Sequence, residues 1–342
     1  MKKLIRQIIF TKVPLGGYYR FSDEFQIFPL ELPEIPKSKF QKQFPNVIEF
    51  WDDQSINIVV PKEFESLREM MERVGRAGII INRLIGLLTC FTNHRFFQIG
   101  DIEGSWGIPI FKDDIGDEIN DQPPVWFMNM YPPKNYLDSF PKASFTEVKL
   151  EKIPQFNHHH YYYHDPNIDS DKKINITFPN TIDNLFASYF NLNEQNRNYI
   201  DTAVYDNSCA VELYRPLKTL SLVSTFTALE TMVNLEFKDV PSEKCETCGQ
   251  QMYSVRKKFR DYLLKYIGNS DGNKKKFNKY YDLRSKIIHT GQKLKSEHLF
   301  TEVESDDSTD EELLRMEILQ LGRLSIIKWL LYSPQKASEI PA

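Results

Sequence analysis

The stretch Tyr280-Tyr281-Asp282-Leu283-Arg284-Ser285-Lys286-Ile287-Ile288-His289-Thr290-Gly291 places an arginine and a histidine five positions apart, near the end of a basic segment. On a helix, five positions are a rotation of about 140°, so Arg284 and His289 share no stripe unless the helix ends or distorts beside them. Gly291 supplies that end, because glycine just beyond a periodic segment is the usual helix stop. We therefore expect a helix whose last turn carries the histidine.

These two residue types suit cleavage of RNA without a metal. The reaction needs a base for the ribose 2′-hydroxyl, an acid for the leaving oxygen and a cation for the negatively charged phosphorane. An imidazole and a permanently charged guanidinium meet these needs. Spacing alone is weak evidence, because about one such match is expected by chance in a chain with seven histidines.

The segment around the stretch is strongly basic. Between Gln251 and Lys295, thirteen lysines and arginines accompany three aspartates, a net charge of +10 in a chain whose total is −4. Segregated positive charge suits a polyanion. Aromatic residues are interleaved, and some could stack on unpaired bases, although helical spacing places most of them in a core. The residues expected to bind RNA are Lys274, Lys275, Lys276, Lys279, Lys286 and Tyr281.

Residues 281–291, together with the upstream segment 220–232, resemble the ApeA-like branch of the HEPN superfamily. The resemblance covers roughly residues 180–335. It implies an all-helical domain that forms a homodimer and cleaves RNA through an Arg-polar-x-x-x-His motif. Arg284 and His289 would then be catalytic, and Ser285 occupies the polar position, where Asn, Asp or His is commoner. The resemblance also implies antiviral defence in bacteria, in which RNA damage arrests growth.

Glu230 stands out as an acidic residue in an apolar segment, residues 217–233, that we expect to form a central helix. One interpretation is that its carboxylate reaches the helix edge or pairs with a basic neighbour. The other is that it faces Arg284 and His289 and orients one of them, which would add Glu230 to the catalytic group.

The length and pattern predict two domains: a mixed α+β domain over residues 1–175 and an all-α helical bundle over residues 176–342. Strands are expected at 5–13, 18–21, 25–30, 47–51, 56–60, 95–99, 106–111 and 144–150, with a long buried helix over 64–92. Residues 165–173 are the candidate linker. The first domain carries no defensible catalytic pattern, so we expect it to recognise an unknown trigger or phage component and to restrain the second.

Helices in the second half are expected over 182–190, from 193, and over 217–233, 253–266, 274–289 and 313–331. Asn180-Thr181 and Asn193 are expected to cap the first two of these helices. Ser308-Thr309-Asp310-Glu311 has the form of a capping box that would open the last one. The acidic residues at 302–312 would then be stabilised by the positive end of the dipole of that helix. The alternative is that they cover the basic segment.

Cys245-Glu246-Thr247-Cys248-Gly249 has the form of a zinc knuckle, although tetrahedral zinc needs four ligands. Two protomers could each give two thiolates, Cys209 or a histidine could complete the site, or the loop could be metal-free. Catalysis itself needs no cofactor, so any zinc would be structural. The histidines of residues 158–164 are expected in a solvated loop or edge strand, with a metal or nucleic-acid contact as the alternative.

The composition favours a soluble, cytoplasmic protein with no membrane partner. The apolar start is interrupted by Arg6 and Gln7, the apolar run 77–91 is shorter than a membrane span, and four cysteines form no secreted disulfide framework. Two functions remain open. One is a homodimeric endoribonuclease, and the other is a non-catalytic module that binds RNA or a nucleotide.

Overall fold

The structure is a computed structural model that describes residues 3–30, 43–98, 144–157, 175–241, 243–244, 251–252, 255–297 and 305–333. It divides into two compact units. The sheet unit comprises Met1–Asn82, Phe96–Gln155 and Ile168–Phe178, and the helical unit comprises Arg83–Arg95, Phe156–Asn167 and Pro179–Ala342. The expected boundary was at residue 175, whereas residues 83–95 group with the helical unit.

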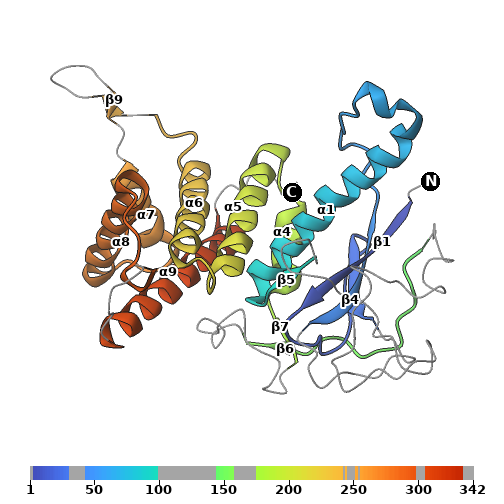
Figure 1. Cartoon of the computed structure of the whole chain (residues 1–342), viewed down its shortest axis with the longest axis horizontal. Helices are drawn as coiled ribbons and strands as arrows, with labels where there is room; N and C mark the ends of the chain where they lie inside the picture. The colour runs from blue at the N-terminus through green and yellow to red at the C-terminus, as the bar shows by residue number, and fades with distance from the viewer. Residues whose placement is uncertain are drawn as a thin grey trace, which may run out of the picture. The chain divides into compact units, whose positions relative to one another are not determined.

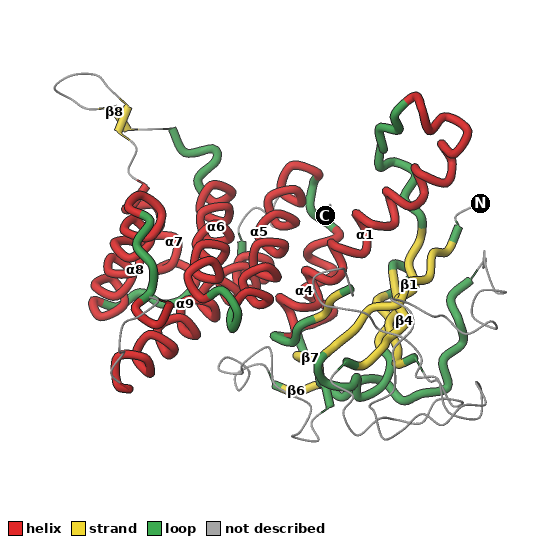
Figure 2. Tube along the Cα trace, in the orientation of Figure 1, coloured by secondary structure: helices red, strands yellow, loops and turns green. Residues whose placement is uncertain are grey.

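The sheet unit is built on five antiparallel strands in the order β2-β3-β4-β1-β5 (Figures 1 and 2). The strands are β1 (Leu4–Thr11), β2 (Tyr19–Phe21), β3 (Phe25–Pro29), β4 (Phe44–Trp51) and β5 (Phe96–Phe97). β1 and β4 pair along their full length, from Leu4 opposite Trp51 to Thr11 opposite Phe44. The expected strands in this region are confirmed, except for those at 56–60 and 144–150.

Those two segments are not strands. Residues 56–60 follow a turn in which the Ser55 amide donates to the Asp53 carboxylate (3.0 Å), and Val59 is 88% exposed, so the segment has left the sheet. Residues 144–150 are held by a side-chain cluster instead of a hydrogen-bond ladder. The expected strand at 106–111 and the linker at 165–173 lie outside the described residues.

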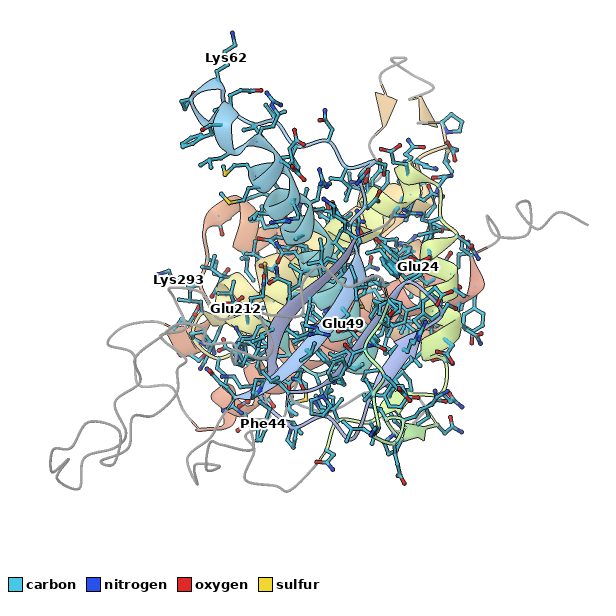
Figure 3. The ribbon with its side chains drawn as sticks, turned by 90° about the vertical axis from the view of Figure 1, so that its right-hand side faces the viewer. Glu24, Phe44, Glu49, Lys62, Glu212 and Lys293 are labelled. Carbon is cyan, nitrogen blue, oxygen red and sulfur yellow. The ribbon has the colours of Figure 1, made fainter. Side chains whose placement is uncertain are left out.

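That cluster is centred on Glu49, which is fully buried on the central strand β4 (Figure 3). Its carboxylate accepts hydrogen bonds from Arg6 Nε (2.6 Å), Gln26 Nε2 (2.6 Å), and the Thr146 amide (2.9 Å) and hydroxyl (2.5 Å). Burial by itself would raise the pKa of Glu49, but the hydrogen bonds from Thr146 and the charge of Arg6 outweigh it and hold the pKa below 4.5. The cluster fixes the 144–150 segment to the sheet.

The expected long helix consists of a 3₁₀ turn, η1 (Lys62–Leu67), followed by α1 (Arg68–Thr92). The expectation that it is buried throughout is wrong for its first part, where Met70 is 45% and Val74 62% exposed. Arg76 makes two hydrogen bonds, of 2.7 and 2.9 Å, to the Asp52 carboxylate, which turns its side of the helix toward the sheet. Val74 lies about 200° around the helix from Arg76, and Met70 lies near Val74, so their face is turned away from the sheet. Among the described residues, Lys62–Thr92 alone is long and apolar enough to span a membrane, and 61% of its most apolar window is buried, as in a core helix.

The helical unit contains α4 (Ile182–Phe190), α5 (Glu194–Leu213), α6 (Lys218–Glu236), α7 (Val255–Tyr266), α8 (Asp271–Thr290), the 3₁₀ turn η4 (Lys295–Glu297) and α9 (Ser305–Tyr332). The expected helices are confirmed. α6 is central, as expected, because it packs against α5, α7, α8 and α9, and α9 crosses its neighbours (Figure 1). Two-residue strands β6 (Gln155–Phe156) and β7 (Phe178–Pro179) pair with each other, as do β8 (Glu243–Lys244) and β9 (Gln251–Met252).

The helix starts differ in whether a local side chain caps them. The Asn193 side chain accepts from the Asn196 amide at the start of α5, and the Ser270 hydroxyl accepts from the Asn273 amide at the start of α8. Thr181 precedes α4 but makes no side-chain cap. The expected capping box at 308–311 is wrong, because α9 already begins at Ser305 and the carboxylate of Glu311 binds a different segment.

Candidate active site

Arg284 and His289 meet at the end of α8. The guanidinium Nη1 lies 3.0 Å from the imidazole Nε2. α8 continues to Thr290 and ends at Gly291, whose φ of 68° is left-handed, so the expected helix stop is confirmed. The long arginine side chain therefore spans the rotation of about 140° that separates the two residues. A guanidinium only donates hydrogen bonds, so Nη1 can donate to Nε2 when this ring nitrogen carries no proton.

Glu230 of α6 holds the other side of the guanidinium. Arg284 Nη2 donates to Glu230 Oε2 (2.8 Å), and Arg284 Nε lies 2.6 Å from Oε1. The two side chains are 13% and 25% exposed, so this ion pair, which contains one hydrogen bond, is largely shielded from water. Glu230 was expected either to pair with a basic neighbour or to face Arg284 and His289. The structure meets both descriptions, because the basic neighbour of Glu230 is Arg284, which contacts His289.

The other residues expected at the site are placed less directly. The Tyr281 ring centroid lies 5.8 Å from Arg284 Cζ and 5.5 Å from the Phe259 ring, so this aromatic side chain packs beside the guanidinium. Ser285 is half-buried, and none of the described hydrogen bonds joins it to Arg284, His289 or Glu230. The geometry thus brings together Arg284, His289, Glu230 and Tyr281.

The expected RNA-binding lysines divide into two groups. Lys276 Nζ lies 2.6 Å from the carboxylate of Glu317 on α9, so it already forms an ion pair within the protein. Lys275, Lys279 and Lys286 are exposed and fall within about 40° of each other on the helical wheel, with His289 within about 80° of them. We call these three residues the lysine stripe. Lys274 is exposed, about 100° away from Lys275.

Sequence reasoning missed the residues that hold the loop after the site, residues 291–297, which we call the clamp loop. The Thr219 hydroxyl of α6 accepts from the Leu294 amide (3.1 Å), and Glu297 Oε2 accepts from the Thr219 amide (2.9 Å) and from its hydroxyl. The Glu311 carboxylate of α9 accepts from the Lys295 (2.7 Å) and Ser296 (3.0 Å) amides. One feature of the sequence could have indicated this contact. Leu217 occupies the N-cap position of α6, and its side chain cannot accept a hydrogen bond, so the first amides of α6 need an acceptor from elsewhere.

The zinc hypothesis is not tested by the geometry. Cys245 and Cys248 lie outside the described residues, in the sequence between strands β8 and β9. The histidines at 158–160 and 164 also lie outside the described residues. Within the described ranges, no group of three or more His, Cys, Asp or Glu side chains could hold a metal ion. Cys209, a candidate further ligand, is half-buried, and burial raises the pKa of its thiol.

The site therefore combines an imidazole, a guanidinium fixed by a carboxylate, and a row of exposed lysines on the same helix. An imidazole lone pair can accept a proton, a guanidinium can stabilise a charged phosphorane, and lysines can hold a phosphate backbone. Comparison of the chain with protein-family models, curated proteins and solved structures finds no match.

Proposed function

We propose that the protein is a metal-independent endoribonuclease with Arg284 and His289 at its active centre. The observation that carries the proposal is the 3.0 Å contact between Arg284 Nη1 and His289 Nε2, with Glu230 fixing the far side of the guanidinium. The resemblance to HEPN ribonucleases adds a homodimer whose two sites meet near the twofold axis. It also adds a cytoplasmic role in antiviral defence, in which the sheet unit controls when RNA is cut.

In this mechanism the neutral His289 accepts the proton of a ribose 2′-hydroxyl at Nε2. The 2′-oxygen then forms a bond to the adjacent phosphorus while the bond from phosphorus to the 5′-oxygen breaks. The products are a 2′,3′-cyclic phosphate and a 5′-hydroxyl. Arg284 turns Nη1 from His289 to the phosphorane, and a protonated imidazole, that of the second protomer in the dimer, delivers a proton to the leaving oxygen.

The test is cleavage of RNA by purified protein in buffer containing EDTA. His289→Ala should lower the rate at saturating RNA by about a hundredfold or more, because a positioned general base contributes about 10²–10⁴. Gln292→Ala is the matched control, since Gln292 is exposed just beyond the same helix end. If the His289→Ala protein cleaves RNA as fast as the control, the enzymatic proposal in this form is wrong.

The competing proposal is a module that binds RNA or a nucleotide without cutting it. The observation that favours it is that Glu230 already pairs with Arg284, whose side chain is only 13% exposed, which limits its contact with a phosphorane. The same assay separates the two proposals. A binding module would retain RNA without cutting it, in both the wild-type and the His289→Ala proteins.

The lysine stripe leads to a separate prediction about RNA capture. Lys275→Gln/Lys279→Gln should weaken RNA binding and flatten the slope of log Kobs against log salt by about 1.4, because each phosphate contact on a single strand contributes about 0.7. Cleavage at saturating RNA should be nearly unchanged. Lys276→Gln removes the same charge from the same helix, but this lysine is already ion-paired with Glu317, so the substitution should change the slope much less. Equal effects from Lys276→Gln and from Lys275→Gln alone would contradict the placement of the RNA.

A further inference from the structure

The start of α6 depends on a carboxylate from outside the helix. The first amides of a helix have no partner within it, and the N-cap residue Leu217 offers none. Glu297 supplies the acceptor, since its Oε2 lies 2.9 Å from the Thr219 amide and also accepts from the Thr219 hydroxyl. Burial by itself would raise the pKa of Glu297, but the hydrogen bonds from Thr219 and Lys218 outweigh it and lower the pKa, which keeps this cap ionised.

Glu297 ends the clamp loop, which starts directly after the last turn of α8. The loop is held at two more points. The Leu294 amide donates to the Thr219 hydroxyl (3.1 Å), and Glu311 accepts from the amides of Lys295 and Ser296. A chain of caps results, in which α9 caps η4 and η4 caps α6. The end of α8 is thus tied to the helix that also carries Glu230.

The last turn of α8 has little else to hold it. Ile287 is buried, but Ile288, His289 and Thr290 are all exposed. Terminal helical turns fray because their last carbonyls lack partners within the helix. Arg284, in contrast, is fixed by Glu230. The distance between the two catalytic side chains therefore depends on what restrains the His289 end.

We propose that Thr219, Glu297 and Glu311 are positioning residues of the site: by clamping residues 291–297 they hold the last turn of α8 so that His289 Nε2 stays beside Arg284. Thr219 and Glu230 lie on one helix, eleven positions apart, so α6 fixes the histidine end with one residue and the arginine with the other. The catalytic consequence rests on the proposed ribonuclease function, whereas the restraint on the imidazole does not.

The restraint is measured on the imidazole itself. In full-length protein labelled with ¹³C,¹⁵N-histidine, the His289 ring signals are assigned by their loss in His289→Gln. In the wild type these signals should report one predominant ring state, in which Nε2 accepts the hydrogen bond from Arg284 Nη1. In Thr219→Val, which keeps the side-chain shape but removes the hydroxyl, they should shift toward the tautomer mixture of a free imidazole. Thr219→Ser should restore the wild-type signals. Thr227→Val is the matched control, because Thr227 lies on the same helix and its exposed hydroxyl donates to Val223 O (3.0 Å) within that helix, away from the clamp loop.

Kinetics give the second readout. Thr219→Val should lower kcat by about tenfold or more with KM nearly unchanged, since small misplacements of reacting groups cost up to about a hundredfold. Glu311→Gln tests the same restraint if Thr219→Val fails to fold. The Lys295 and Ser296 amides donate to different oxygens of the Glu311 carboxylate, and glutamine replaces one of these oxygens with an NH₂ group that cannot accept. Both readouts should therefore move in the same direction as in Thr219→Val. Glu312→Gln is the exposed neighbouring control.

The outcomes separate the two proposals. Wild-type ring signals and wild-type kcat in folded Thr219→Val and Glu311→Gln proteins would overturn the positioning role. A loss of kcat that Thr219→Ser does not restore would overturn it as well. If the wild-type protein does not cleave RNA, the ribonuclease proposal fails, and the ring signals still decide whether the clamp loop holds His289.

Discussion

Arg284→Ala should lower the single-turnover rate of RNA cleavage at saturating RNA by about 10³-fold, the upper end of what one electrostatic contact to a transition state contributes. The loss is large because Arg284 has two roles in the proposed mechanism. It stabilises the phosphorane, and its Nη1 holds the Nε2 of His289 at 3.0 Å. The substitution also leaves the carboxylate of Glu230, 25% exposed, without its cation.

Two further variants show how much of the loss belongs to charge and how much to geometry. Arg284→Lys keeps the positive charge but not the fork of donors, so it should recover little activity. Glu230→Gln keeps a hydrogen-bond acceptor beside Arg284 but removes the ion pair, so it should lower the rate by less than Arg284→Ala. Circular dichroism on each protein controls for unfolding of the helices.

The rate and the affinity are measured separately, by single-turnover cleavage and by binding to RNA whose 2′-hydroxyls are blocked. A role in the transition state lowers the rate with a small change in affinity. Should Arg284→Ala weaken binding while the saturated rate stays at the wild-type level, Arg284 is a phosphate-binding residue and the cation of the reaction is another group.

Glu49→Ala should destabilise the sheet unit by about 3–5 kcal/mol, the cost of removing one partner from a buried ion pair. Glu49 is fully buried and its partner Arg6 is 6% exposed, so the variant leaves a guanidinium charge with little access to water. The donors from Gln26 and Thr146 lose their acceptor as well. Hydrogen exchange of the β1 and β4 peptides measures the sheet unit separately from the helical unit.

The double variant Arg6→Met/Glu49→Leu is the matched control, because replacing both partners with apolar groups leaves no isolated charge. It should be markedly more stable than Glu49→Ala. Equal destabilisation by the two proteins would show that the ion pair itself stabilises the sheet unit and that the unpaired charge is not the cause.

The Glu49 carboxylate also makes the sheet unit sensitive to acid. Its pKa in the folded protein is lowered from 4.5, so the folded state binds the proton less readily than the unfolded state does. The stabilisation is complete above the unfolded value of about 4.5 and is lost as the pH falls through the folded value. Exchange in the β4 peptide should therefore accelerate more steeply below about pH 4.5 in the wild type than in the double variant.

The sequence by itself determined the features that depend on a few neighbouring residues. Gly291 ends α8 because glycine adopts the left-handed conformation at low cost, and Asn193 starts α5 because its side chain accepts a hydrogen bond from an amide three positions on. Short β-rich runs bounded by proline and glycine placed β1 and β4. The 3.6-residue period placed α4, and a run that is apolar on nearly every side after Pro216 placed α6. These rules act within about one helical turn or along one strand.

Only the tertiary structure decided which side chains became partners. It joined Glu230 to Arg284 across 54 positions, paired Lys276 with Glu317 while Lys275 stayed exposed, and replaced the expected capping box at 308–311 with a cap that Glu311 gives to η4. It also drew Thr146 away from a strand and onto Glu49. At the Arg284–Glu230 and Thr146–Glu49 contacts, a buried or half-buried polar group took the partner that packing brought within about 3 Å, and an unsatisfied group there would have cost about 1–3 kcal/mol. Such choices depend on where the helices and strands meet, which no local pattern encodes.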